Sequence, residues 1–206
     1  MTKSAYDIPL LSIDGSYDVM FSLKGKVSMI TNIASKLGYT PQCSPVWSYA
    51  RTCKYLWELQ TVHDMFKNRG FSIVGIPCNQ FGKQEPKENL EIQEFIKKFY
   101  PFVNFPITEK IDVNGKNEHP LYDFLKGEQK RAYSDTTADG TDAAKEGQNL
   151  AGQAIARIPH SYEKFLLGSN GIVVSRFNWQ DGPLDEEPRV MGAGWTITEA
   201  IDELLG

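Results

Sequence analysis

The sequence predicts an α/β fold in which a central mixed β-sheet is flanked by helices. Two short apolar runs, 25–33 and 71–77, are rich in β-branched residues and are bounded by Gly, Asn or Pro, which is typical of buried strands. A stretch with apolar residues at helical spacing, 54–69, lies between these runs, and a second one, 89–99, follows them. This alternation favours parallel strands whose faces are covered by helices.

The first half of the chain supplies most of these signals. Residues 6–21 predict an irregular β-hairpin, because Asp14-Gly15 is a turn signal. The helix over 54–69 ends at Gly70, a residue that commonly follows a helix. The run 71–77 is almost continuously apolar, so we expect a central parallel strand that is buried on both faces. The apolar positions of the helix predicted over 54–69 are Tyr55, Leu59, Val62 and Phe66.

The later elements have recognisable ends. Asn89 is suited to cap the second helix, and Pro101 ends it. A short third helix is bracketed by Pro120 at its start and Gly127 at its end.

A further strand, 171–177, precedes the C-terminal helix. That last helix begins with a capping box formed by Thr196 and Glu199. No internal repeat interrupts the pattern, so the whole chain, 1–206, is expected to form a single domain.

Composition excludes several classes of function. The net charge is −4 and no run of Lys or Arg is long, so nucleic acid is not an expected partner. No apolar stretch approaches the roughly 18 residues of a membrane span. The N-terminus lacks the apolar region of a signal peptide, so an intracellular, cytoplasmic setting is expected. Three dispersed histidines and three cysteines lack metal-ligand spacing, and neither a metal nor another cofactor is expected.

Several segments resemble the glutathione peroxidases, in the same order along the chain. These segments are NIASKLGYT (32–40), PCNQFGKQEP (77–86), KIDVNG (110–115), HPLYDFLK (119–126) and GIVVSRF (171–177). The second of them is the most specific. The resemblance extends over 5–126 and 157–180 and implies the thioredoxin-like version of the α/β fold.

The resemblance also shows which active-site residues differ. In the family a Cys or selenocysteine acts as the nucleophile, and Leu37 stands at that position in this chain. Gln80 matches the family's Gln, whereas His160 and Ser161 stand where the family has Trp and Asn. Leucine can neither ionise nor donate a proton. The residues of the family site therefore predict a catalytically degraded protein with no confident catalytic residue.

Two segments interrupt the resemblance, at 41–53 and 127–156. The first has no strand or helix period and carries the aromatic residues Trp47 and Tyr49, a type enriched where proteins meet. The second is small, polar and rich in Gly, so it cannot bury enough surface to order itself. Tetrameric members of the family carry a long loop at the second place. We therefore expect a non-catalytic subunit of a larger assembly or a homo-oligomer.

The alternative interpretation is a thiol-dependent hydroperoxide reductase that uses a displaced cysteine. Cys43 could attack the peroxide and Cys53 could resolve the oxidised thiol, since both lie in the first insertion. The same two residues could instead be unreactive thiols or a disulfide, since a proline-rich loop does not preorganise a thiol of low pKa. Cys78 follows an apolar strand and is expected to be a buried, inert thiol.

Two further hypotheses concern the degraded site. His160 could act as a base for Ser161 in a hydrolase, but adjacent residues rarely orient on each other and no acidic residue is identified to orient the histidine. A pocket that retains Gln80 could also bind a thiol or a peroxide-like ligand without turnover.

Overall fold

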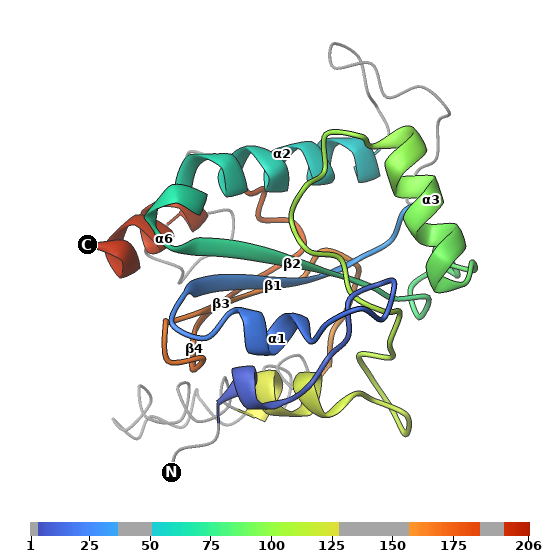
Figure 1. Ribbon diagram of the computed structural model, residues 1–206, viewed down its shortest axis with the longest axis horizontal. Helices are drawn as coiled ribbons and strands as arrows, with labels where there is room; N and C mark the ends of the chain where they lie inside the picture. Colours follow the sequence, from blue (N-terminus) through green and yellow to red (C-terminus); the bar gives the residue numbers. More distant parts are fainter. Residues whose placement is uncertain (1–3, 37–50, 128–156, 186–195) are drawn as a thin grey trace, which may run out of the picture.

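A four-stranded mixed sheet forms the centre of the computed structural model, which describes residues 4–36, 51–127, 157–185 and 196–206 (Figure 1). The strand order is β2-β1-β3-β4. β1 pairs in parallel with β2 and antiparallel with β3, and β3 pairs antiparallel with β4. The predicted α/β class with a mixed sheet is confirmed. The strands are β1 (Val27–Ile33), β2 (Phe71–Pro77), β3 (Lys164–Leu167) and β4 (Val173–Phe177).

The sequence prediction misplaced the centre of this sheet. All seven residues of β1 are buried, and β1 has a full strand on each side. β2 is equally buried but lies at the end of the order, where its outer neighbour is an isolated bridge between Gly75 and Ile107. β3 was missed, because its four residues are too few to show a strand period.

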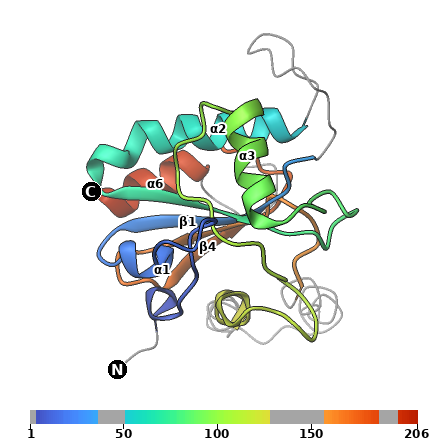
Figure 2. The same ribbon diagram turned by 45° about the vertical axis from the view of Figure 1, so that its right-hand side comes forward.

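Helices cover both faces of the sheet (Figure 2). α2 (Arg51–Phe66), α3 (Asn89–Phe99) and α6 (Ile197–Leu205) contribute to one apolar cluster. α1 (Val19–Ser22), the 3-10 turn η1 (Ala5–Asp7) and the helical residues 120–127 contribute to the other. A second 3-10 turn, η2 (Lys67–Arg69), ends at Gly70, which has φ 91°.

Three element predictions need correction. The N-terminal hairpin is reduced to one bridge between Leu11 and Asp18, because the chain then turns into α1. The cap of α3 is Glu88, which forms a capping box with Glu91, while the side-chain oxygen of Asn89 accepts the Lys110 amide at 2.9 Å. β4 begins two residues later than predicted, after the turn at Gly171.

The first predicted insertion is shorter than expected at its C-terminal end. α2 begins at Arg51, so residues 51–53 belong to this helix and not to a loop. The rest of that segment, 41–50, and all of the second segment beyond Gly127 lie outside the described residues. That these two segments take part in subunit contacts stays a prediction. The single domain over 1–206 also stays a prediction.

Gly75 allows the stretch around Ile107 to lie directly against β2. A Cβ atom added at Gly75 would lie 2.7 Å from Ile107 Cδ1 and 3.1 Å from a ring carbon of Phe105. The Gly75 amide donates to the Pro106 carbonyl at 2.9 Å, and the Thr108 amide donates to the Gly75 carbonyl at 3.0 Å. The backbone therefore cannot move away without breaking this bridge.

We expect Gly75→Ala to lower the free energy of unfolding by about 1–3 kcal/mol, the range for an overpacked core. Gly127→Ala is the matched control, because a Cβ there meets nothing within 4 Å. Its effect should stay within about 0.5 kcal/mol, as for an ordinary surface change. Urea unfolding of both variants measures the difference, and equal stabilities would contradict the close-approach argument.

A buried carboxylate holds the turn that follows β1. Glu85 is 0 % exposed and accepts hydrogen bonds from the Ser35 amide at 2.6 Å and from the Ser35 hydroxyl at 2.7 Å. The Glu85 amide in turn donates to the side chain of Asn79 at 3.0 Å. Burial raises the pKa of Glu85 above its usual 4.5 in spite of these bonds.

The pKa shift of Glu85 predicts a pH-dependent stability. The folded protein binds this proton more tightly than the unfolded chain, so stability is lost as pH rises from about 4.5 through the raised pKa. Glu85→Gln cannot titrate. We expect the wild-type free energy of unfolding, minus that of Glu85→Gln, to fall between about pH 4 and about pH 7.

Urea unfolding at both pH values measures this difference. The exposed Glu94, changed to Gln, is the matched control, and its difference from wild type should change far less. A difference for Glu85→Gln that rises with pH would contradict the expected sign.

Candidate functional site

The candidate site lies where the chain leaves β1 and where α2 begins. Both ends are on the same side of the molecule in Figure 1. Leu37 and Cys43 lie outside the described residues. Cys53 is the third residue of α2, so its backbone belongs to the first turn of a 16-residue helix. The unsatisfied amides and the dipole at such a helix start stabilise a negative charge.

Asn32, in β1, holds the segment that carries His160 and Ser161. Its side-chain amide donates to the His160 carbonyl at 3.0 Å, and its carbonyl accepts the Tyr162 amide at 2.6 Å. Tyr162 has φ 71°, a left-handed conformation that is uncommon for a residue with a side chain. The Tyr162 hydroxyl donates to the Ala34 carbonyl at 3.1 Å. The structure thus brings His160 and Ser161 to the end of β1.

His160 lies beside two other rings, those of Trp179 and Phe81. Its imidazole stacks on Trp179, with ring centroids 4.5 Å apart and planes at 26°. The centroids of the His160 and Phe81 rings are 6.3 Å apart, and their planes meet at 20°. Trp179 follows β4 and was missed by sequence reasoning, since no motif marks it. All three rings are half-buried.

His160 and Ser161 do not form a base–nucleophile pair. The Nδ1 atom of His160 lies 3.1 Å from the Ser161 carbonyl oxygen, not from its hydroxyl. The Ser161 hydroxyl is buried and, within the described part of the chain, has no hydrogen-bond partner. The geometry therefore gives the hydrolase hypothesis no activated serine.

Gln80 is bound by its side chain to a neighbouring loop. Its Oε1 atom accepts the amides of Val113 and Asn114, both at 3.0 Å, and its Nε2 atom donates to the Asn114 carbonyl at 2.7 Å. The Asn114 side chain then makes two hydrogen bonds to the backbone of Ile158, at 2.8 and 3.0 Å. In this arrangement Gln80 positions the segment that leads to His160.

Beside Gln80 lies a cavity of about 580 Å³. It borders the His160 ring stack, formed by Phe81, His160 and Trp179, because Phe81 belongs to the stack and also lines the cavity. The cavity also holds the ion pair between Lys126 and Glu118, whose charged atoms are 2.6 Å apart. Its lining residues are Gln80, Phe81, Asn114, Gly115, Glu118, Lys126 and Arg157.

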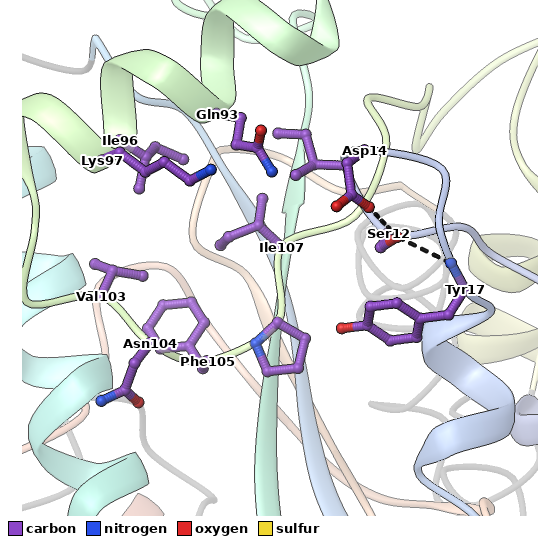
Figure 3. Close-up of a pocket in the computed structure, with 12 residues that line it drawn as sticks. Ser12, Asp14, Tyr17, Gln93, Ile96, Lys97, Val103, Asn104, Phe105 and Ile107 are labelled. Atoms are coloured by element: carbon purple, nitrogen blue, oxygen red, sulfur yellow. Dashed lines mark hydrogen bonds between the residues drawn. The ribbon is translucent and has the colours of Figure 1, made fainter.

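A second cavity, of about 270 Å³, lies away from these residues (Figure 3). It is bounded by α3, by the stretch 12–17 and by the stretch 103–107. Asp14, at its rim, is already hydrogen-bonded to the hydroxyls of Ser12 and Ser16. Because it shares no residue with the ring stack, we place the candidate site at the end of β1 and not at this cavity.

Cys78 is buried, as predicted. Its side chain is 0 % exposed, and burial raises the pKa of its thiol. A thiol with a raised pKa forms little of the reactive thiolate. Among the described residues, no group of three His, Cys, Asp or Glu side chains could hold a metal ion. The described helices include none both long and apolar enough to cross a bilayer.

Comparison with known proteins identifies relatives that match most of the chain. The chain is 38% identical over 189 residues to "Glutathione peroxidase-like peroxiredoxin 2" of Saccharomyces cerevisiae, which covers 91% of this chain and 96% of the relative. It is 35% identical to "Glutathione peroxidase" of Lactococcus lactis, with 90% and 96% covered. Among solved structures, the apo form of Trgpx superposes with a TM-score of 0.62 at 26% identity, covering 100% of this chain and 97% of that one.

These findings overturn the prediction of a non-catalytic assembly subunit. Relatives that are 33–38% identical carry names of peroxidases, peroxiredoxins and a hydroperoxy fatty acid reductase. The prediction placed too much weight on the replaced residues of the family site, Leu37, His160 and Ser161, from which the loss of the chemistry was inferred. The relatives favour the alternative interpretation, a thiol peroxidase.

The thioredoxin-like fold is confirmed by the same comparisons, since the T. cruzi GPX1 structure also superposes, with a TM-score of 0.57 at 26% identity over 98% of this chain and 95% of that one. The profile of the glutathione peroxidase family matches residues 5–126, more than half of the chain. That match includes the turn after β1 and the segment around Gln80. With the identities above, it establishes that this chain belongs to the glutathione peroxidase family.

Proposed function

We propose that this protein is a thiol-dependent hydroperoxide reductase in which Cys53 attacks the peroxide and Cys43 resolves the oxidised thiol. The observation that carries the proposal is the place of Cys53 in the first turn of α2, beside the end of β1. The names of the relatives support the reaction class.

The choice of Cys53 follows from the three cysteines of the chain. Cys78 is buried with a raised thiol pKa, which leaves Cys43 and Cys53 for a thiol reaction. The helix start favours the thiolate form of a cysteine within its first turn. This reverses the roles that the sequence alone suggested, because the sequence placed Cys53 in a loop.

The first turns of α2 also pack against the segment that carries His160. Tyr55, two residues after Cys53, stacks on Tyr162 with ring centroids 4.7 Å apart. Tyr162 is held to β1 through Asn32 and Ala34. The helix that carries the thiol is therefore fixed to the end of β1, where the family mounts its nucleophile.

The proposed reaction balances in three steps. The Cys53 thiolate attacks one peroxide oxygen, the O–O bond breaks, and the leaving oxygen takes a proton to become water or an alcohol. The sulfur is thereby oxidised to a sulfenic acid. The Cys43 thiol then displaces water and forms a disulfide. A dithiol protein of the thioredoxin type, or two glutathione molecules, reduces that disulfide by thiol exchange.

Single cysteine variants test this assignment. We expect Cys53→Ser to abolish the reaction of the reduced protein with one equivalent of hydroperoxide. Cys43→Ser should still consume that equivalent and leave a sulfenic acid that dimedone traps, but it should not turn over. Wild type with a thioredoxin-type reductant should turn over at about 1–10³ per second, the usual range of enzymes.

Cys78→Ser is the matched control and should behave like wild type in both assays. Loss of the peroxide reaction in Cys43→Ser, with retention in Cys53→Ser, would reverse the proposed roles. Wild type that consumes no hydroperoxide, or turnover that persists in the double variant of Cys43 and Cys53, would refute the proposed function.

A further inference from the structure

Lys164, the first residue of β3, is a fully buried lysine beside the candidate site. Its side chain is 0 % exposed, and its ammonium group donates to three carbonyl oxygens. These belong to Tyr162 at 2.8 Å, Asn178 at 3.1 Å and Asp181 at 2.8 Å. An ammonium group has three N–H donors, so every donor of Lys164 is used.

The three carbonyls belong to the two segments that carry His160 and Trp179. Tyr162 lies two residues after His160, and Asn178 and Asp181 lie on either side of Trp179. His160 and Trp179 stack with centroids 4.5 Å apart. One ammonium group therefore fixes both halves of the stack relative to each other.

Lys164 also faces α2. Its nitrogen lies 5.9 Å from the centroid of the Tyr55 ring, and Tyr55 stacks on Tyr162. Glu58, one turn further along α2, is buried and contributes an opposite charge. Lys164 thus joins three parts of the site: the end of β1 through Tyr162, the loop around Trp179 and the helix that carries Cys53.

We propose that Lys164 is the positioning residue of this site, whose buried ammonium group holds the His160–Trp179 stack and the start of α2 in one arrangement. The proposal deepens the proposed function, on which its consequence for the peroxide reaction rests. All three N–H donors of Lys164 go to backbone carbonyls, which is why we assign it a positioning role.

The protonation state of Lys164 gives the arrangement a pH dependence. Burial lowers the pKa of Lys164 to about 8, against the attraction of the acidic groups around it. The acidic groups that face it are Glu58 from α2, Glu163 just before β3, and Asp181 and Asp185 from the loop after β4. Of the neighbouring cations, Lys54 in α2 pairs with Glu58. Arg176 and Glu163 pair with each other at 2.8 Å. Because a neutral amine has only two N–H donors, one of the three carbonyl bonds is lost above this pH.

The test follows the ring stack by NMR, independently of activity. The Hε1 resonance of His160 should be shifted by the ring current of Trp179, and among three histidines it can be assigned with His160→Gln. We expect Lys164→Met to abolish that shift. In wild type the resonance should move about pH 8, where Lys164 loses its proton, and Lys164→Met should lack this step.

Ile201→Ala is the control for lost stability. Ile201 is buried in α6, which lies near the C-terminal end of α2, away from Cys53 (Figure 1). This variant should be less stable and keep both the ring-current shift and the step about pH 8. The single-turnover peroxide reaction should fall about tenfold or more in Lys164→Met, because small misplacements reduce rates steeply, and should be retained in Ile201→Ala.

The outcomes separate this proposal from the proposed function. If wild type consumes no peroxide, the function fails, while the resonance still decides whether Lys164 holds the stack. A ring-current shift that survives in Lys164→Met, or a wild-type resonance without a step about pH 8, would overturn the positioning role. A lost shift with an unchanged peroxide rate would overturn its link to the reaction. Should Lys164→Met fail to fold, the wild-type titration alone decides whether the positioning role holds.

Discussion

The hydrogen bond from the Tyr162 amide to the Asn32 carbonyl, 2.6 Å long, is the contact on which the site depends. It joins the end of the fully buried strand β1 to a segment 130 positions further along the chain. Tyr162 adopts a left-handed conformation to make it, which costs on the order of 1–3 kcal/mol and persists only where the surroundings impose it. Asn32, Ala34, Lys164 and Tyr55 supply those surroundings through hydrogen bonds and ring stacking.

Buried charges stabilise the two turns on either side of this contact. Glu85 accepts hydrogen bonds from the amide and the hydroxyl of Ser35, and Lys164 donates to three carbonyls around Tyr162 and Trp179. Burial disfavours the charged form of both residues, raising the pKa of Glu85 and lowering that of Lys164. Removing one partner of such a group leaves unsatisfied polar atoms in the interior, which is more costly than losing a surface contact. The turn after β1 and the segments around Tyr162 and Trp179 are therefore held firmly, although they are neither helix nor strand.

Residues of the family site are replaced in this chain, or are bound to other parts of the fold. Leucine stands at the nucleophile position, yet the helix after β1 still begins beside the strand end and has a cysteine in its first turn. Gln80 keeps its position in sequence, but its amide is bound to the loop of Val113 and Asn114. The proposed function therefore rests on the arrangement of helix, strand and neighbouring loops and not on a single position in a motif.

The sequence by itself determined the fold class, the bounds of β2, the capping box of the last helix and the burial of Cys78, since local patterns of apolar and capping residues specify them. It did not determine the order of the strands, because pairing depends on contacts between distant segments. β3 is too short to show a period, and the start of α2 at Arg51 has no strong local signal. Only the tertiary structure decided that Trp179 stacks on His160 and that Lys164 joins both to α2, because these residues meet through strand pairing and not through spacing in the chain.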